Sequence, residues 1–167
     1  MPRRLRRGKS SVRRFAFALG VVLVSLSARA QTTTQRAADI ASWGTVSTNA
    51  ALQTLAALRG PSPSCAVKQE AVAVGVAVGV SELLKALIRK QRPDGSDFKS
   101  FPSEHTAIAF ATSGYSVAFG YSLAIGTAAG RVTAKKHDGW DVSAGAAIGE
   151  GGQWLGRALF HCPAAPP

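Results

Sequence analysis

Three groups of polar side chains interrupt an otherwise apolar chain of 167 residues and are its candidates for chemistry. The first group contains Lys85 and Arg92, which lie seven residues apart and directly before Pro93. Seven residues make almost two helical turns, so both basic side chains can project from one face of a helix. Two cations on one face can bind an anion.

The second group is the run Pro102-Ser103-Glu104-His105. Its serine precedes an apolar segment and is predicted to be the N-cap of a helix. The first N–H groups of a helix have no partner within it and carry the positive end of its dipole, so they favour a bound anion. The run therefore indicates a second anion-binding element with an imidazole beside it.

The third group combines Arg131, His137 and Asp141 in the pattern R-x5-H-x3-D. His137 and Asp141 are four residues apart, a spacing at which the carboxylate can bind one imidazole nitrogen and fix the tautomer of the ring.

Each group taken alone has an ordinary structural explanation, such as a solvated basic helix face, a helix cap or a surface histidine. Together the groups supply three cations, a helix start and two histidines, one of which has a carboxylate partner. This combination suits phosphoryl transfer, in which cations hold the phosphate oxygens, one histidine attacks phosphorus and another protonates the leaving oxygen.

The order K-x6-R-P, P-S-x-H and R-x5-H-x3-D resembles the three-part signature of the type 2 phosphatidic acid phosphatases. That superfamily also includes bacterial non-specific acid phosphatases and vanadium haloperoxidases. The match runs from Lys85 to Asp141, and the Ala- and Gly-rich stretch Val142–Gly149 is similar to the family as well. The resemblance implies a phosphohydrolase that acts on phosphomonoesters, with lipid phosphates such as phosphatidic acid among the expected substrates.

The resemblance also implies a role for each matched residue. His137 would form a phosphohistidine intermediate, Asp141 would orient it, and His105 would protonate the leaving alcohol. Five groups would bind the phosphate: Lys85, Arg92, Ser103, the backbone amide of Glu104, and Arg131. This scheme needs no metal and no cofactor, and vanadate is an expected inhibitor.

Two positions depart from the family pattern. Glu104 replaces the usual glycine of P-S-G-H, and Gly130 replaces the serine that usually precedes the arginine. A Glu104 side chain directed inward would repel a phosphate dianion, whereas at the first helical position it is expected to point outward and favour the helix dipole. The alternatives are a catalytically weak phosphate- or lipid-binding module, or a vanadium-dependent haloperoxidase, although those enzymes are usually much longer.

Ala- and Leu-rich segments separated by Gly, Pro and polar clusters predict an all-α fold, a compact bundle of about five helices. The expected helices cover Arg36–Arg59, Val67–Gln91, a segment that begins after Ser103, Tyr121–Thr133 and Gly139–Phe160. Pro93 disfavours helical backbone at Arg92 and is therefore expected to end the second helix. Small residues at four-residue spacing, such as Gly145 and Gly149, predict close packing between helices.

The candidate site also constrains the path of the uncharged stretch Ala107–Gly130. If His105 and Arg131 bind one phosphate, a single helix between them would hold them roughly 39 Å apart. The chain is therefore expected to fold back between Gly114 and Gly120. Each half is then too short to cross a bilayer, and the site is expected at one end of the bundle.

Residues 1–30 have the three parts of a secretory signal peptide. They contain eight of the 20 Lys and Arg residues and no acid, then the apolar run Phe15–Leu26, then a cleavage site at Ala28-Arg29-Ala30. The expected mature domain, residues 31–167, keeps 12 bases (20 − 8) against 9 acids, so the net charge of +11 gives little support to a nucleic-acid partner. We expect an exported, periplasmic protein, with peripheral membrane association or an uncleaved N-terminal anchor as alternatives.

The chain has two cysteines, Cys65 and Cys162. An oxidising compartment permits a disulfide between them, and two unpaired thiols are the alternative. Neither cysteine has a histidine at a metal-ligand spacing, which argues against a zinc site.

Overall fold

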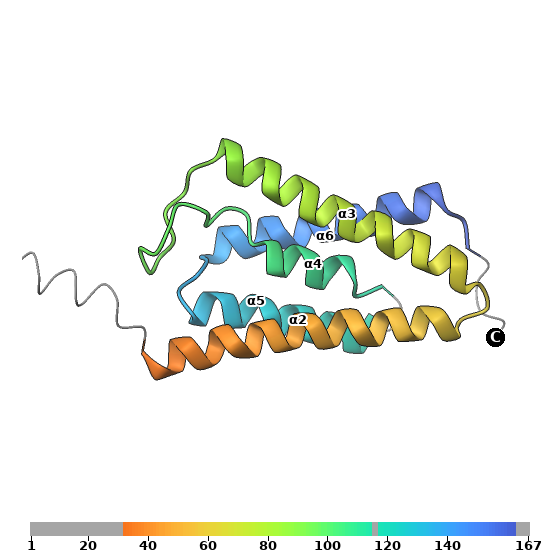
Figure 1. The fold of residues 1–167 in the computed structure, drawn as a ribbon, viewed down its shortest axis with the longest axis horizontal. Helices are drawn as coiled ribbons and strands as arrows, with labels where there is room; N and C mark the ends of the chain where they lie inside the picture. Colours follow the sequence, from red (N-terminus) through yellow and green to blue (C-terminus); the bar gives the residue numbers. More distant parts are fainter. Residues whose placement is uncertain (1–31, 115–116, 163–167) are drawn as a thin grey trace, which may run out of the picture. The chain divides into compact units, whose positions relative to one another are not determined.

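The computed structural model describes residues 32–114 and 117–162. Within these ranges the chain forms five helices, drawn in Figure 1: α2 (Thr33–Arg59), α3 (Pro63–Leu87), α4 (Glu104–Ala111), α5 (Val117–Thr133) and α6 (Gly139–Leu159). The predicted all-α bundle of five helices is confirmed for this part of the chain. The predicted signal peptide lies outside the described residues.

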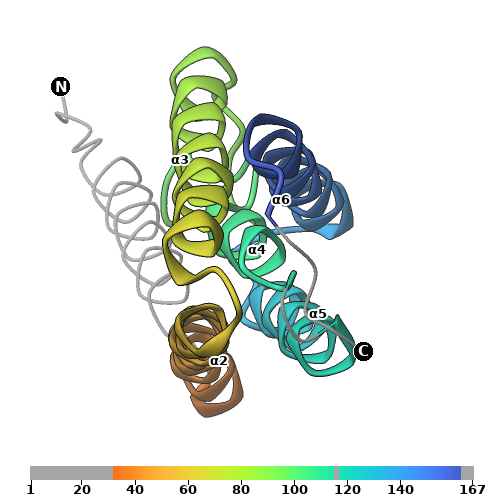
Figure 2. The same cartoon turned by 90° about the vertical axis from the view of Figure 1, so that its right-hand side faces the viewer.

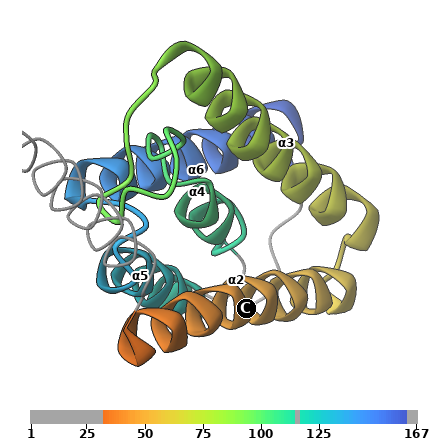
Figure 3. The same ribbon diagram turned by 60° about the vertical axis from the view of Figure 1, so that its left-hand side comes forward.

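The short helix α4 lies at the centre of the bundle. It packs against each of the other four described helices, which surround it in Figure 2 and Figure 3. Its inward positions are small residues, because Ala107, Ala109 and Ala111 are almost completely buried. A central helix with small side chains lets the neighbouring helices approach closely. Their ends therefore lie near the ends of α4.

Glycines of α6 provide the close approach that the four-residue spacing predicts. A Cβ atom added at Gly149 would lie 2.8 Å from the backbone nitrogen of Ala111 in α4, and one at Gly152 would lie 2.6 Å from the carbonyl oxygen of Ala73 in α3. Real Cβ atoms do not approach backbone so closely, so these positions require glycine. The packing places the start of α6 beside the start of α4.

The helix α3 ends earlier than the sequence predicts. It stops at Leu87 rather than at Gln91, and the next residue, Ile88, has an extended backbone. Lys85 therefore lies in the last turn of α3, whereas Arg92 lies in the loop that follows. The prediction that both side chains project from one helix face is wrong.

Backbone pairing within the α3–α4 loop explains the early end. The amide of Ser100 donates to the carbonyl oxygen of Lys90 at 3.0 Å, and Lys90 and Lys99 form an isolated parallel bridge. The loop thereby satisfies backbone groups that a longer helix would otherwise have paired. It also carries Ser100 to a buried position beside the start of α6.

The chain reverses direction between Ala111 and Val117, so α4 and α5 run antiparallel (Figure 1). The reversal begins slightly before the predicted range, Gly114–Gly120, because α5 starts at Val117. It returns Arg131, in the last turn of α5, to the end of the bundle where α4 begins. Among the described helices, none combines the length and the apolarity that a membrane crossing requires.

A disulfide joins Cys65, in the first turn of α3, to Cys162, which follows α6. The two Cα atoms are 5.7 Å apart, and the bond connects positions separated by 97 residues. Since α3 and α6 also pack against each other, the bond fixes one end of this pair of helices. The other end of α3 carries Lys85.

Candidate active site

Helix ends and two loops bring the predicted site residues to one end of the bundle (Figure 1). Two lie at the C-terminal ends of α3 and α5, four at or near the N-terminal ends of α4 and α6, and two in loops. In chain order they are Lys85, Arg92, Ser103, Glu104, His105, Arg131, His137 and Asp141. The three sequence groups thus converge, although they come from different elements.

His137 is buried, with 2% of its surface exposed, and its ring is held by a backbone group. Its Nδ1 atom lies 2.6 Å from the carbonyl oxygen of Ser100. A carbonyl oxygen only accepts, so Nδ1 donates and the neutral ring keeps a lone pair on Nε2. Burial, followed by the charges of Arg131 and Arg92, lowers the pKa of His137 to about 4, so the ring is neutral at neutral pH.

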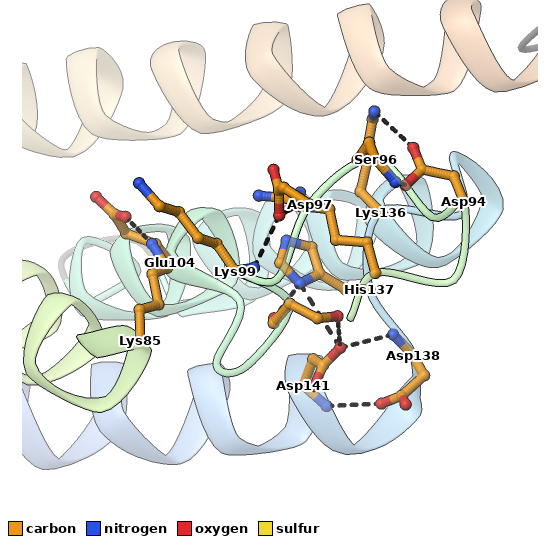
Figure 4. A network of polar contacts seen from close by, with 12 residues as sticks. Lys85, Asp94, Ser96, Asp97, Lys99, Glu104, Lys136, His137, Asp138 and Asp141 are labelled. Carbon is orange, nitrogen blue, oxygen red and sulfur yellow. Dashed lines mark hydrogen bonds and ion pairs between the residues drawn. The ribbon is translucent and has the colours of Figure 1, made fainter. Parts of the chain in front are cut away.

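Asp141 does not make the direct hydrogen bond to His137 that the four-residue spacing predicts. Its Oδ2 atom is 3.8 Å from Nδ1, beyond hydrogen-bond distance. The buried carboxylate instead accepts from Ser100 Oγ at 2.5 Å and from Lys90 Nζ at 2.8 Å. It also closes a capping box with Asp138 at the start of α6. Asp141 therefore reaches the histidine through Ser100, and Figure 4 shows Asp141 and His137 close together.

His105 lies in the first turn of α4 against Trp43 of α2, with ring centroids 3.9 Å apart in an edge-on arrangement. Its Nε2 atom is buried and has no hydrogen-bond partner. Burial lowers the pKa of His105 to about 3, and the charges of Arg131, His137, Lys85 and Arg92 act in the same direction. The cations and both histidines lie at the same end of the bundle, and their assignment to one site stays a prediction.

Each cation of the site is paired with a carboxylate. Arg92 Nε donates to Asp97 Oδ1 at 2.7 Å within the α3–α4 loop. The buried Arg131 pairs with Asp39 of α2, and Lys85 pairs with Glu104. One nitrogen of this set, Arg131 Nε, is buried without a hydrogen-bond partner. Arg131 Nε can only donate and His105 Nε2 can donate or accept, and neither has a hydrogen-bond partner.

Glu104 points toward the end of α3 and is not fully directed to solvent, since 28% of its side chain is exposed. Its carboxylate contacts Lys85 Nζ, and Figure 4 shows the two side chains directed at each other from α4 and α3. The expected outward orientation is therefore wrong. The reason is electrostatic, because the lysine lies directly across from the first residue of α4 and attracts the carboxylate more strongly than solvent does.

Ser103 occupies the predicted N-cap position of α4, but its side chain makes no cap hydrogen bond. The hydroxyl is completely buried and lies 2.9 Å from Thr106 Oγ1. Its backbone amide donates to the carbonyl oxygen of Asp141 at 2.9 Å, which ties the start of α4 to the start of α6.

Among the residues of this network that were not found from sequence are Asp39, Trp43, Lys90 and Ser100. Asp39 and Trp43 are one helical turn apart, so an acid and an aromatic at that spacing could have indicated a common face. Lys90 lies within the first sequence group but outside its pattern. Ser100 acts mainly through its carbonyl oxygen, a group that every residue has, so no residue-type signal marks it.

A separate cavity lies between α3, α6 and the end of α4. It is lined by Gln69, Glu70, Gly114, Gln153 and Arg157, among others, and by none of the eight candidate residues. Within the part of the chain that the structure describes, no three His, Cys, Asp or Glu side chains gather as metal ligands would.

The structure thus shows a helical bundle that carries a buried histidine, a half-buried histidine and three cations at one end. The chain is 36% identical over 109 residues to lipid A 1-phosphatase of Porphyromonas gingivalis, a match that covers 54% of this chain and 24% of that protein. The chain thus spans about a quarter of the length of the curated relative that it matches. No protein-family model and no solved structure matches the chain.

Proposed function

We propose that the protein is a metal-independent phosphohydrolase that cleaves phosphomonoesters, lipid phosphates included, through a phosphohistidine intermediate. The observation that carries this proposal is the hydrogen bond from His137 Nδ1 to the carbonyl oxygen of Ser100. It leaves the Nε2 lone pair of a neutral ring free to attack phosphorus. The resemblance to the type 2 phosphatidic acid phosphatases and the similarity to lipid A 1-phosphatase support the same activity.

The proposed reaction has two balanced steps. In the first, His137 Nε2 bonds to phosphorus while the ester P–O bond breaks, and His105 gives its proton to the leaving oxygen. In the second, a water oxygen attacks phosphorus, the N–P bond breaks, and His105 takes up the proton of the water. The low pKa of His105 describes the free protein, and a bound phosphate dianion raises that pKa and favours the protonated ring.

The cations are proposed to hold the phosphate oxygens and the charge that develops on them. Arg131 is the most buried of the three, with 3% of its surface exposed, and its Nε has no partner. A buried N–H without a partner is costly, and a phosphate oxygen would satisfy it. Lys85 and Arg92, which are less buried, are proposed to supply the remaining charge, and the Ser103 hydroxyl a further hydrogen bond.

Exposed aromatic side chains at the same end of the bundle support access to a lipid substrate at a membrane surface. Trp140, at the start of α6, is 81% exposed, and Phe98, in the α3–α4 loop, is 50% exposed. The guanidinium of Arg89 lies 5.6 Å from the centre of the Phe98 ring. An aromatic group with a cation beside it suits the boundary between lipid tails and anionic head groups.

We also propose that the protein is exported to the periplasm. The signal-like composition of residues 1–30 supports this location. The disulfide between Cys65 and Cys162 is a bond that persists in oxidising compartments.

One observation favours a second candidate function. The Glu104 carboxylate on Lys85 places a negative charge where the proposed function needs a positive one. A module that binds a phosphate or lipid weakly and without turnover would need less positive charge at that position.

The test measures phosphate release by the purified protein in EDTA, from a soluble phosphomonoester and from a short-chain phosphatidic acid. We expect His137→Ala to abolish release on both substrates. His161→Ala is the matched control, because this histidine is exposed and follows α6. Equal release by the wild type and His137→Ala would refute the phosphohistidine mechanism. Phosphate binding without release by the wild type would favour the binding module.

A further inference from the structure

Lys85 is held between two carboxylates of different character. Glu82 lies one turn earlier on α3, is 56% exposed at its side chain, and contacts Lys85 Nζ at 2.8 Å. Glu104 contacts the same nitrogen from α4 and is 28% exposed. The lysine side chain itself is 10% exposed. The more exposed carboxylate thus binds the cation from its own helix, and the less exposed one binds it from α4, as Figure 4 shows for Glu104.

Glu104 is the carboxylate that a phosphate at this site would have to displace. Its backbone lies between Ser103 and His105, so its side chain starts at the expected phosphate position. Asp97, the partner of Arg92, also accepts from the amide of Lys99 at 2.8 Å and is fixed within its loop. Glu104 is the first residue of its helix and can turn its side chain away without moving the backbone.

We propose that Glu104 is a specificity-determining residue that occupies the anion position on Lys85 until a phosphate ester displaces it, so that free orthophosphate binds weakly. The selection of esters rests on the proposed function above. The exchange of carboxylate for phosphate does not, because it concerns binding alone.

The physical reason is a competition between anions. Orthophosphate offers Lys85 the same kind of ion pair that Glu104 already makes, so the exchange gains little and leaves a carboxylate near the dianion. An ester gains further contacts between its alcohol portion and the protein, and these contacts favour displacement. After hydrolysis the alcohol leaves, those contacts are lost, and Glu104 returns to the lysine. The return of Glu104 to Lys85 therefore limits inhibition by the product phosphate.

The experiment measures orthophosphate binding to the full chain by titration calorimetry at neutral pH and constant ionic strength. Glu104→Gln keeps the shape of the side chain and removes its charge, and we expect the dissociation constant to fall 10- to 100-fold. Glu82→Gln is the matched control, because it removes the other carboxylate from the same lysine, and we expect a change of less than threefold. Glu104→Gly is measured in parallel and should resemble Glu104→Gln.

Three results would overturn the proposal: unchanged affinity in both Glu104 variants, equal tightening by Glu82→Gln, or no orthophosphate binding by any variant. Thermal unfolding of each variant establishes that it is folded, and Glu104→Gly serves if Glu104→Gln is not. Turnover separates this inference from the proposed function. Tighter orthophosphate binding without turnover in the wild type would refute the phosphatase and leave the inference standing. Turnover by the wild type, with orthophosphate binding unchanged in the Glu104 variants, would refute the inference and support the phosphatase.

Discussion

The two ends of α4 are surrounded by buried polar side chains of different kinds. At the N-terminal end these are charged groups and histidines, and two nitrogens, His105 Nε2 and Arg131 Nε, lack a partner. At the C-terminal end they are mostly neutral amides and hydroxyls, such as Asn49, Ser113 and Gln153. Asn49 donates to the carbonyl oxygens of Ala109 and Gly120 at 3.0 and 3.3 Å. Completed amide hydrogen bonds hold helices together, whereas the unmet nitrogens of an imidazole and a guanidinium are suited to a ligand.

The largest expected effect is a loss of catalysis with little loss of stability, at the N-terminal end of α4. We expect His105→Ala to lower kcat for phosphate release by about 10²–10⁴-fold, because the variant lacks the proposed proton donor. Its free energy of unfolding should fall by no more than about 2 kcal/mol, since Nε2 has no hydrogen bond to lose and only the packing of the ring against Trp43 is removed. Steady-state kinetics and denaturant unfolding check both parts. A variant that is unstable but fully active per folded molecule would contradict the comparison.

The pH dependence of stability should also come from the N-terminal end. The pKa of His137 is about 4 in the folded protein, against 6.5 ordinarily. Between these values the unfolded chain binds a proton that the folded chain does not, so lowering the pH from 6.5 to 4 favours unfolding. The loss is on the order of 3 kcal/mol for this histidine, and His105 acts in the same direction.

Denaturant unfolding at pH 7, 5.5 and 4.5 measures this loss. His105→Ala provides the internal control, because removal of one buried histidine should make the stability depend less on pH. Stability that stays constant or rises as the pH falls through this window would show that the two histidines are not buried as neutral rings.

At the C-terminal end we expect the opposite pattern, a loss of stability without a loss of chemistry. Gln153 Nε2 donates to the carbonyl oxygen of Phe110 and to Ser113 Oγ, and Arg157 donates to its Oε1. Gln153→Leu leaves these groups unpaired and should lower the free energy of unfolding by about 1–3 kcal/mol. Phosphate release per folded molecule should stay within twofold of the wild type. A large loss of kcat would show that the two ends are coupled.

The smallest expected effect tests whether Lys90 positions His137. Its Nζ contacts Asp138 at 2.5 Å and Asp141 at 2.8 Å, and Asp141 in turn binds Ser100, which holds His137. We expect Lys90→Met to lower kcat about tenfold, or about 1.4 kcal/mol, with little change in KM, because it loosens the nucleophile. Lys90→Arg keeps the charge and should recover most of the rate. Equal rates for both variants would exclude a positioning role.

The sequence predicted the five helices well because long Ala- and Leu-rich segments are separated by Gly and Pro. The structure brings the three sequence groups to the same end of the bundle, as expected, and the role of each residue stays a prediction. The sequence placed Arg92 on a helix because Pro93 was the nearest visible stop, whereas backbone pairing of Lys90 with Ser100 ends α3 at Leu87. Pairings of that kind depend on hydrogen bonds that carry no residue-type signature.

Three features of the site could not be predicted from the sequence, because each depends on contacts that form only in the folded protein. The partner of Arg131 is Asp39, 92 residues earlier, and no local pattern connects them. The group that holds His137 is a carbonyl oxygen and not the carboxylate at the expected spacing. The direction of Glu104 depends on where the end of α3 brings Lys85, which only the packed bundle determines.

The central position of α4 has a consequence for how the molecule folds. The helix has eight residues, too few for a stable helix on its own, and its contacts come from all four surrounding helices. It should therefore form only when those helices have assembled, and its amide hydrogens should exchange with solvent through global unfolding alone. Because the two histidines and their cations are brought together at its first turn, partly folded chains would have no site. Activity would then appear only in the last step of folding.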